Sequence, residues 1–171
     1  MDQSIKKEFL EREILTWSIV GGLSRGRNVY TKETKESDRN ALKRFLRKEL
    51  RDRFDSNYRP DSEHHINNLK GFKNDIDIKF REILEHKEIY FGRVQKIVNL
   101  YLKYRWVCFG EQRPIHCPID SIILKELGLS NVYWTAMTMA QYKTALAKIK
   151  STSIAEWEID LFNRKNITYK Q

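Results

Sequence analysis

The 171-residue sequence has few residues that stop helices and few that could cross-link the chain. Its three prolines and seven glycines leave room for long helices. The only two cysteines, Cys108 and Cys117, have a spacing that matches no zinc site, and we expect small buried side chains in a reduced, cytoplasmic protein. The longest apolar run, residues 14–23, is interrupted by polar residues and falls short of the roughly 20 residues that a membrane span needs. A transmembrane protein is excluded, no secretory leader is recognised, and neither a metal nor a cofactor is predicted.

Positive charge is what the chain has in excess. It carries 32 Lys and Arg residues against 23 Asp and Glu residues, for a formal net charge of +9. The basic residues run through the whole sequence and do not form a single tail. This distribution favours a polyanionic partner, with nucleic acid ahead of an anionic membrane surface.

Apolar residues recur at three- and four-residue intervals along most of the chain, and no stretch alternates as a strand would. The length and the 40% apolar composition suit one hydrophobic core. We therefore predict a compact all-α fold of seven or eight helices in a single domain, residues 1–171. The helices are expected over residues 5–20 (ending at Gly21 and Gly22), 39–54, 62–84 (with a break near Gly71), 92–107, 120–127, 138–149 and 151–162.

Two basic segments are candidates for anion binding. In the predicted helix 39–54, Lys43 and Arg47 belong to a row of basic side chains opposite the apolar stripe. This row is either a solvated face with local ion pairs or a series of phosphate contacts that would position nucleic acid without reading its sequence. The loop GGLSRGRN could present backbone N–H groups together with Arg25 and Arg27, although its glycines follow no phosphate-loop spacing.

The segment FGRVQKIVNLYLKY, residues 91–104, is apolar over most of its helical circumference. Lys96, Asn99 and Lys103 nevertheless fall on one narrow polar stripe. Such a stripe either extends its lysines to solvent or lines a cleft, and by itself the first interpretation is preferred. A second segment, CPIDSIIL, places Asp120 where it would cap the next helix.

Taken together, these two segments resemble the helix-hairpin-helix DNA glycosylases, in particular the archaeal 8-oxoguanine glycosylase branch, over about residues 80–127. That superfamily places a catalytic lysine at the start of the hairpin's second helix and an aspartate in a Pro-aliphatic-Asp stretch that opens the following helix. Lys96 and Asp120 occupy these positions. The resemblance implies a helix-hairpin-helix-like element, in which the usual pair of hairpin glycines is reduced to Gly92.

The resemblance also implies chemistry and a DNA partner. The lysine would attack C1′ of a deoxyribose whose base is flipped out of the duplex, and it must be neutral to do so. Since a free lysine has a pKa of about 10.4, burial or nearby positive charge must lower it. Asp120 would stabilise the oxocarbenium-like sugar or assist proton transfer. The expected nucleic-acid contacts are Arg25, Arg27, Lys43, Arg47, Gly92, Arg93 and Lys103.

Two hypotheses of different classes follow. The first is an enzyme, a DNA N-glycosylase with abasic-site lyase activity that uses Lys96 and Asp120. The alternative is a non-catalytic, basic helical protein that binds nucleic acid or a regulatory partner. The two differ in whether the Lys96 amine and the Asp120 carboxylate must face one shared cleft.

Overall fold

The computed structural model describes residues 2–26 and 28–168, and within these residues the chain is helical and contains no strand. The predicted all-α fold is confirmed, whereas the helix-hairpin-helix element stays a prediction. A single bridge between Tyr30 and Leu84 is the only strand-like pairing described. The elements are α1 (Gln3–Leu23), α2 (Glu36–Arg53), α3 (Ser62–Phe80), η1 (Arg81–Ile83), α4 (Phe91–Phe109), α5 (Ser121–Glu126), η2 (Trp134–Ala136), α6 (Met139–Lys148) and α7 (Ile154–Thr168).

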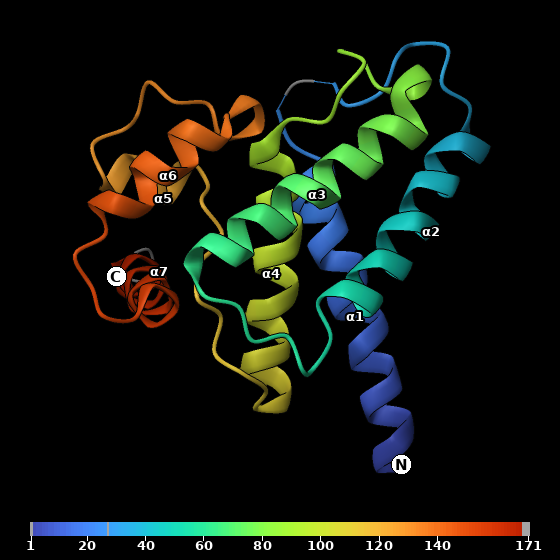
Figure 1. The fold of residues 1–171 in the computed structure, drawn as a ribbon. Coiled ribbons are helices and arrows are strands. Elements are labelled where there is room, and N and C mark those ends of the chain that lie inside the picture. Colours follow the sequence, from blue (N-terminus) through green and yellow to red (C-terminus); the bar gives the residue numbers. More distant parts are fainter. Residues whose placement is uncertain (1, 27, 169–171) are drawn as a thin grey trace.

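Helix α4 runs through the centre of the molecule (Figure 1). Helices α1 and α3 pack along it, and α5, α6 and α7 lie on the side opposite α2. Residues 91–101 of α4 are all buried, which explains why this segment is apolar around most of its circumference. The side chains that form the centre of the core include Leu42, Leu46 and Leu50 of α2, Leu69, Phe72 and Ile76 of α3, and Val94, Ile97 and Val98 of α4.

The first helix ends at Leu23, one residue beyond the predicted end at Gly21 and Gly22, so both glycines lie in its last turn. A Cβ atom on Gly22 would lie 2.2 Å from Ile97 Cγ1, and one on Gly21 would lie 2.6 Å from Leu100 Cδ1. The two glycines therefore serve the close approach of α1 to α4. A single sequence does not separate this use of glycine from a helix stop.

The structure of two other helices also differs from the predictions. Helix α3 is continuous through Gly71, and its N-cap is Asp61, whose carboxylate accepts a hydrogen bond from the His64 N–H at 2.8 Å. Helix α7 begins at Ile154, later than predicted.

The two cysteines behave differently. Cys117 is buried as predicted, but Cys108 is exposed. Cys108 lies in the last turn of α4, where Val107 is also largely exposed, so this end of the helix extends beyond the core. Within the described residues, no helix combines the length and the apolar character needed to cross a membrane.

Candidate functional site

The polar stripe of α4 faces the chain segment HCPID, residues 116–120. The Gln95 amide makes two hydrogen bonds to Ile119: its Nε2 donates to the Ile119 carbonyl at 2.7 Å, and its Oε1 accepts from the Ile119 N–H at 3.0 Å. One turn further along α4, Asn99 Nδ2 donates to the Cys117 carbonyl at 3.0 Å. Both amide side chains are fully buried. Gln95 and Asn99 therefore bind the segment that leads into α5 and are not directed at solvent.

Lys96 and Asp120 meet at the end of this segment. Lys96 Nζ lies 3.2 Å from Asp120 Oδ2, and the ring of Trp134 lies 4.2 Å from the same nitrogen. The other carboxylate oxygen, Oδ1, caps α5 by accepting hydrogen bonds from the N–H groups of Ile122 and Ile123, at 2.9 and 3.2 Å. The first turn of α5 thus fixes the orientation of the carboxylate, which offers one oxygen to the lysine.

The surroundings of Lys96 disfavour its charged form. Burial lowers the pKa of Lys96 below its usual value, the Asp120 carboxylate opposes this, and the positive charges of Arg25 and Lys103 add to the lowering. The side chain is only 9% exposed. A lower pKa increases the neutral fraction of the amine at a given pH, which is the condition a lysine nucleophile requires.

Lys96 and Asp120 line one cleft of about 500 Å³ between α1, α4, α5 and α7. Three aromatic side chains, Trp17, Tyr104 and Phe162, also line it. Trp17 and Phe162 are 59% and 50% exposed, so their rings are accessible from solvent. The volume is in the range of small-molecule sites, and exposed aromatic rings are the side chains on which unpaired bases stack.

Lys103 lines the same cleft but is paired. Its Nζ donates to both carboxylate oxygens of Glu158 in α7, at 2.9 and 3.1 Å. Burial raises the pKa of Glu158 above its usual value, although Lys103 opposes this. Because the carboxylate offsets the ammonium charge, Lys103 adds little net positive charge for a phosphate. Its predicted DNA contact stays a prediction.

Gly92 and Arg93, two other predicted contacts, lie in the interior. Arg93 is 2% exposed, and its guanidinium donates to the carbonyl groups of Gly22 and Arg25 at 2.8 and 3.1 Å, which holds the end of α1. The Gly92 N–H donates to the Met137 carbonyl at 2.9 Å, and a Cβ atom on Gly92 would lie 1.8 Å from the Trp134 carbonyl oxygen. Gly92 is therefore packed against η2, and the Arg93 guanidinium is bound to backbone carbonyls. In this arrangement neither residue is open to a ligand.

The remaining predicted contacts separate into two groups. Arg25 is exposed and lines the Lys96 cleft, whereas Arg27 lies outside the described residues. Lys43 and Arg47 are half-buried on α2, and Lys43 lies 3.9 Å from Glu36. Helix α2 lies on the far side of the molecule from α7, which forms one wall of the cleft (Figure 1). The structure therefore brings Arg25 to Lys96 and keeps the basic row of α2 away from it.

A buried polar network that was not predicted from the sequence connects to the same stripe. His65 Nε2 and Asn99 Oδ1 are 2.8 Å apart, and Asn99 Nδ2 donates to Tyr142 OH at 2.9 Å. Tyr142 OH then lies 3.1 Å from His116 Nδ1, whose Nε2 lies 2.8 Å from Ser62 Oγ. The sequence offered no local pattern for this network, because its members lie on separate elements and meet only in the folded chain.

The direction of these hydrogen bonds can be assigned. The Cys117 carbonyl can only accept, so Asn99 Nδ2 must face it and Asn99 Oδ1 must face His65. Since Asn99 donates to Tyr142 OH, the buried tyrosine proton finds its acceptor at His116 Nδ1. The His116 Nε2–H group then donates to Ser62, which is therefore not activated as a nucleophile.

Both histidines of the network are neutral near pH 7. Burial lowers the pKa of His65 to about 4, against a smaller opposing effect of its bond to Asn99. Burial also lowers the pKa of His116 to about 3, and His65 adds to this. Within the part of the chain that the structure describes, no group of three or more His, Cys, Asp or Glu side chains is placed to hold a metal ion.

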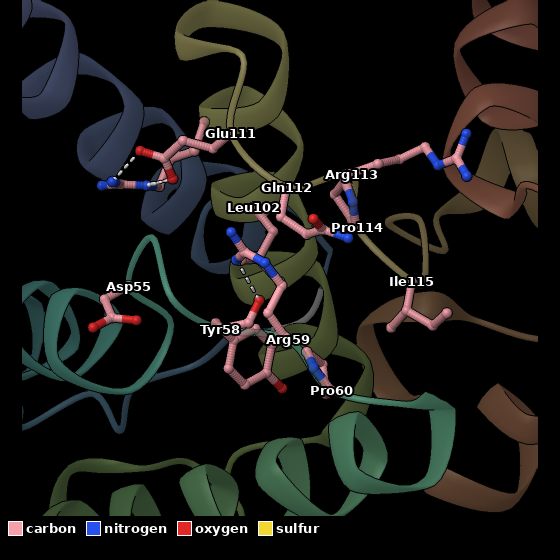
Figure 2. A pocket seen from close by; sticks show the side chains of 11 residues that line it. Asp55, Tyr58, Arg59, Pro60, Leu102, Glu111, Gln112, Arg113, Pro114 and Ile115 are labelled. Atoms are coloured by element: carbon pink, nitrogen blue, oxygen red, sulfur yellow. Dashed lines mark hydrogen bonds and ion pairs between the residues drawn. The ribbon is translucent and has the colours of Figure 1, made fainter.

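A second cavity of about 70 Å³ lies beside the C-terminal half of α4, and Figure 2 shows Tyr58, Arg59 and Glu111 around it. Arg105, which also lines it, binds both oxygens of Glu111, with Nε 2.7 Å from Oε2, and donates to Tyr101 OH at 2.9 Å. Burial alone would lower the pKa of Arg105, but Glu111 and Tyr101 outweigh burial and raise it. Of the three arginines that line this cavity, Arg105 and Arg113 are paired with glutamates, and Arg59 donates to the backbone carbonyls of Ser56 and Tyr58.

Comparison with known proteins adds no assignment to this geometry. No family model, no curated protein and no solved structure matches the chain. The functional proposal therefore depends on the residues of the Lys96 cleft.

Proposed function

We propose that this protein is a DNA N-glycosylase with abasic-site lyase activity, in which Lys96 is the nucleophile and Asp120 its acidic partner. The observation that carries the proposal is the 3.2 Å contact between Lys96 Nζ and Asp120 Oδ2 in one open cleft, made by residues 24 positions apart. Both groups line this cleft of about 500 Å³, so a molecule bound in the cleft could reach them.

The proposed reaction uses the neutral Lys96 amine. The amine attacks C1′ of the target deoxyribose, a new N–C1′ bond forms as the glycosidic bond breaks, and the base leaves with the electron pair and takes a proton from solvent. Opening of the sugar ring gives a Schiff base. Loss of a C2′ proton then expels the 3′ phosphate by β-elimination, and water releases the lysine. The Asp120 carboxylate stabilises the positive charge that develops on the sugar.

The cleft has features that suit a flipped nucleotide. Trp17 and Phe162 offer exposed rings from two different helices, so a base could stack beside the lysine. Arg25 supplies an exposed positive charge where a phosphate would enter. The net charge of +9 favours the approach of DNA.

Borohydride trapping tests the proposal directly. Borohydride reduces a Schiff base to a stable amine, so the wild-type protein should form a covalent adduct with duplex DNA that contains an abasic site. Lys96→Met should form none, because methionine fills the same space without an amine. Lys125→Met is the matched control, since Lys125 is exposed on the neighbouring α5 and should be dispensable. No wild-type adduct with abasic or base-modified DNA, or an adduct that persists in Lys96→Met, would contradict the proposal.

A second candidate function is nucleic-acid binding without chemistry. It is favoured by the basic row of α2, in which Arg44, Lys48 and Arg51 are exposed and lie away from the cleft. Under this alternative, the wild type and Lys96→Met bind DNA equally well and neither is trapped.

A further inference from the structure

The segment that delivers Asp120 to Lys96 is held by side chains. Among the described residues, no backbone–backbone hydrogen bond secures residues 111–119. Close to Asp120, the contacts that fix the main chain come from α4, through Gln95 at Ile119 and Asn99 at Cys117. The position of the Asp120 carboxylate along α4 therefore depends on these two amides.

Gln95 makes the more specific of the two contacts. Its Nε2 donates both to the Gly92 carbonyl of its own helix at 2.8 Å and to the Ile119 carbonyl at 2.7 Å, while its Oε1 accepts from the Ile119 N–H. The two carbonyls fix which end of the amide carries the nitrogen, because a carbonyl can only accept. A carboxamide of this length offers the acceptor and the donor that match the N–H and the carbonyl of one residue, Ile119. Glutamate would lack the donor, and methionine would lack both groups.

We propose that Gln95 is a positioning residue that fixes the main chain at Ile119 and thereby sets the Asp120 carboxylate against the Lys96 amine. Its side chain does not touch the reacting atoms, and it acts through the residue that precedes Asp120. The functional meaning of this role rests on the glycosylase proposal, but the contact itself can be tested without DNA.

The test measures the titration of the Lys96 amine. In protein labelled with ¹³C at lysine Cε, the Lys96 resonance is identified by its absence in Lys96→Arg, and its midpoint is followed with pH. Asp120→Asn should move the midpoint to lower pH, because the carboxylate opposes the lowering of the Lys96 pKa. Gln95→Met should move it in the same direction, since Asp120 is no longer held in place. The double variant should shift no further than Asp120→Asn alone.

Two outcomes would overturn the role of Gln95: an unchanged midpoint in Gln95→Met, or an equal shift in the presence and absence of the Asp120 carboxylate. Gln141→Met is the matched control, because Gln141 also bonds a backbone N–H, that of Thr138, but far from the HCPID segment. If Gln95→Met does not fold, Gln95→Asn serves in its place, since it keeps the amide on a side chain too short to reach Ile119.

Trapping on abasic DNA then separates the two proposals. If Lys96 is the nucleophile, the plateau rate of trapping should be lower in Gln95→Met, because Asp120 no longer stabilises the charge on the sugar. The acid limb of the pH profile should move to lower pH, as in Asp120→Asn. If the wild type forms no adduct at all, the glycosylase proposal fails, and the titration of Lys96 still decides whether Gln95 positions Asp120.

Discussion

Lys96 and Arg105 are two cations of the same helix, and each faces a carboxylate from a following segment. Arg105 donates hydrogen bonds to both carboxylate oxygens of Glu111 and to Tyr101 OH. Its pKa is raised in spite of burial. Lys96 receives one oxygen of Asp120, and burial lowers its pKa. The two sites therefore have similar components and opposite electrostatic outcomes.

The difference lies in what else each carboxylate binds. Glu111 gives both oxygens to one guanidinium, a two-point pairing that is strong and directional. Asp120 divides its oxygens between Lys96 and the first turn of α5. A buried lysine with a lowered pKa beside an open cleft is the arrangement that the proposed nucleophile requires.

The largest effects are expected when lysine and arginine are exchanged at the two sites. Lys96→Arg keeps a positive charge beside Asp120 and Trp134, but a guanidinium does not lose its proton in a protein, so borohydride trapping should fall by about 1,000-fold or more. Arg105→Lys should leave trapping unchanged and lower the free energy of unfolding by about 1–2 kcal/mol, because the two-point contact is lost. Trapping that survives in Lys96→Arg would show that another amine reacts.

The packing that brings Trp134 over Lys96 gives the next largest effect. Gly92→Ala places a methyl group against the Trp134 carbonyl and should lower the free energy of unfolding by about 3 kcal/mol, measured by urea denaturation. The control is Gly71→Ala, since a Cβ atom there meets nothing within 4 Å and should stabilise α3 by about 0.5–1 kcal/mol. Similar changes in the free energy of unfolding in Gly92→Ala and Gly71→Ala would mean that Trp134 of η2 does not pack against Gly92.

The smallest expected effect is a change in the salt dependence of DNA binding. It tests whether DNA contacts the cleft or the basic row of α2. Each phosphate contact changes the slope of log K against log salt by about 0.9. If DNA binds at the cleft, Arg25→Gln should reduce the slope by about one such step, and the double variant Lys43→Gln, Arg47→Gln should leave it unchanged. The reverse pattern would place the DNA on α2 and favour binding without chemistry.

Much of the fold could be predicted because its signals are local. The apolar periodicity predicted the all-α class and nearly all of the helices, and Asp120 was correctly predicted to cap a helix. That Lys96 and Asp120 meet could not be read from such local signals; it was expected only from the resemblance of their two segments to the helix-hairpin-helix glycosylases.

The rest depends on contacts between distant residues, which leave no pattern in one sequence. The glycines of α1 could be interpreted as a helix stop until Ile97 and Leu100 were seen against them. Arg93 carries the same charge as an exposed arginine, and only the carbonyls of Gly22 and Arg25 show its structural use. The roles of Gln95 and His116 likewise arise from partners 24 or more residues away.

The walls of the Lys96 cleft come from α1 and α7, two helices far apart in sequence, with Trp17 on one and Phe162 on the other. While α7 is still inside the ribosome, a nascent chain can already form the contact between α1 and α4. The wall of the cleft that α7 supplies, with Glu158, is then missing. Lys96 would then be more exposed to water, with a pKa closer to that of an ordinary lysine. Under the proposed function, the site around Lys96 would therefore be complete only after α7 has packed at the cleft.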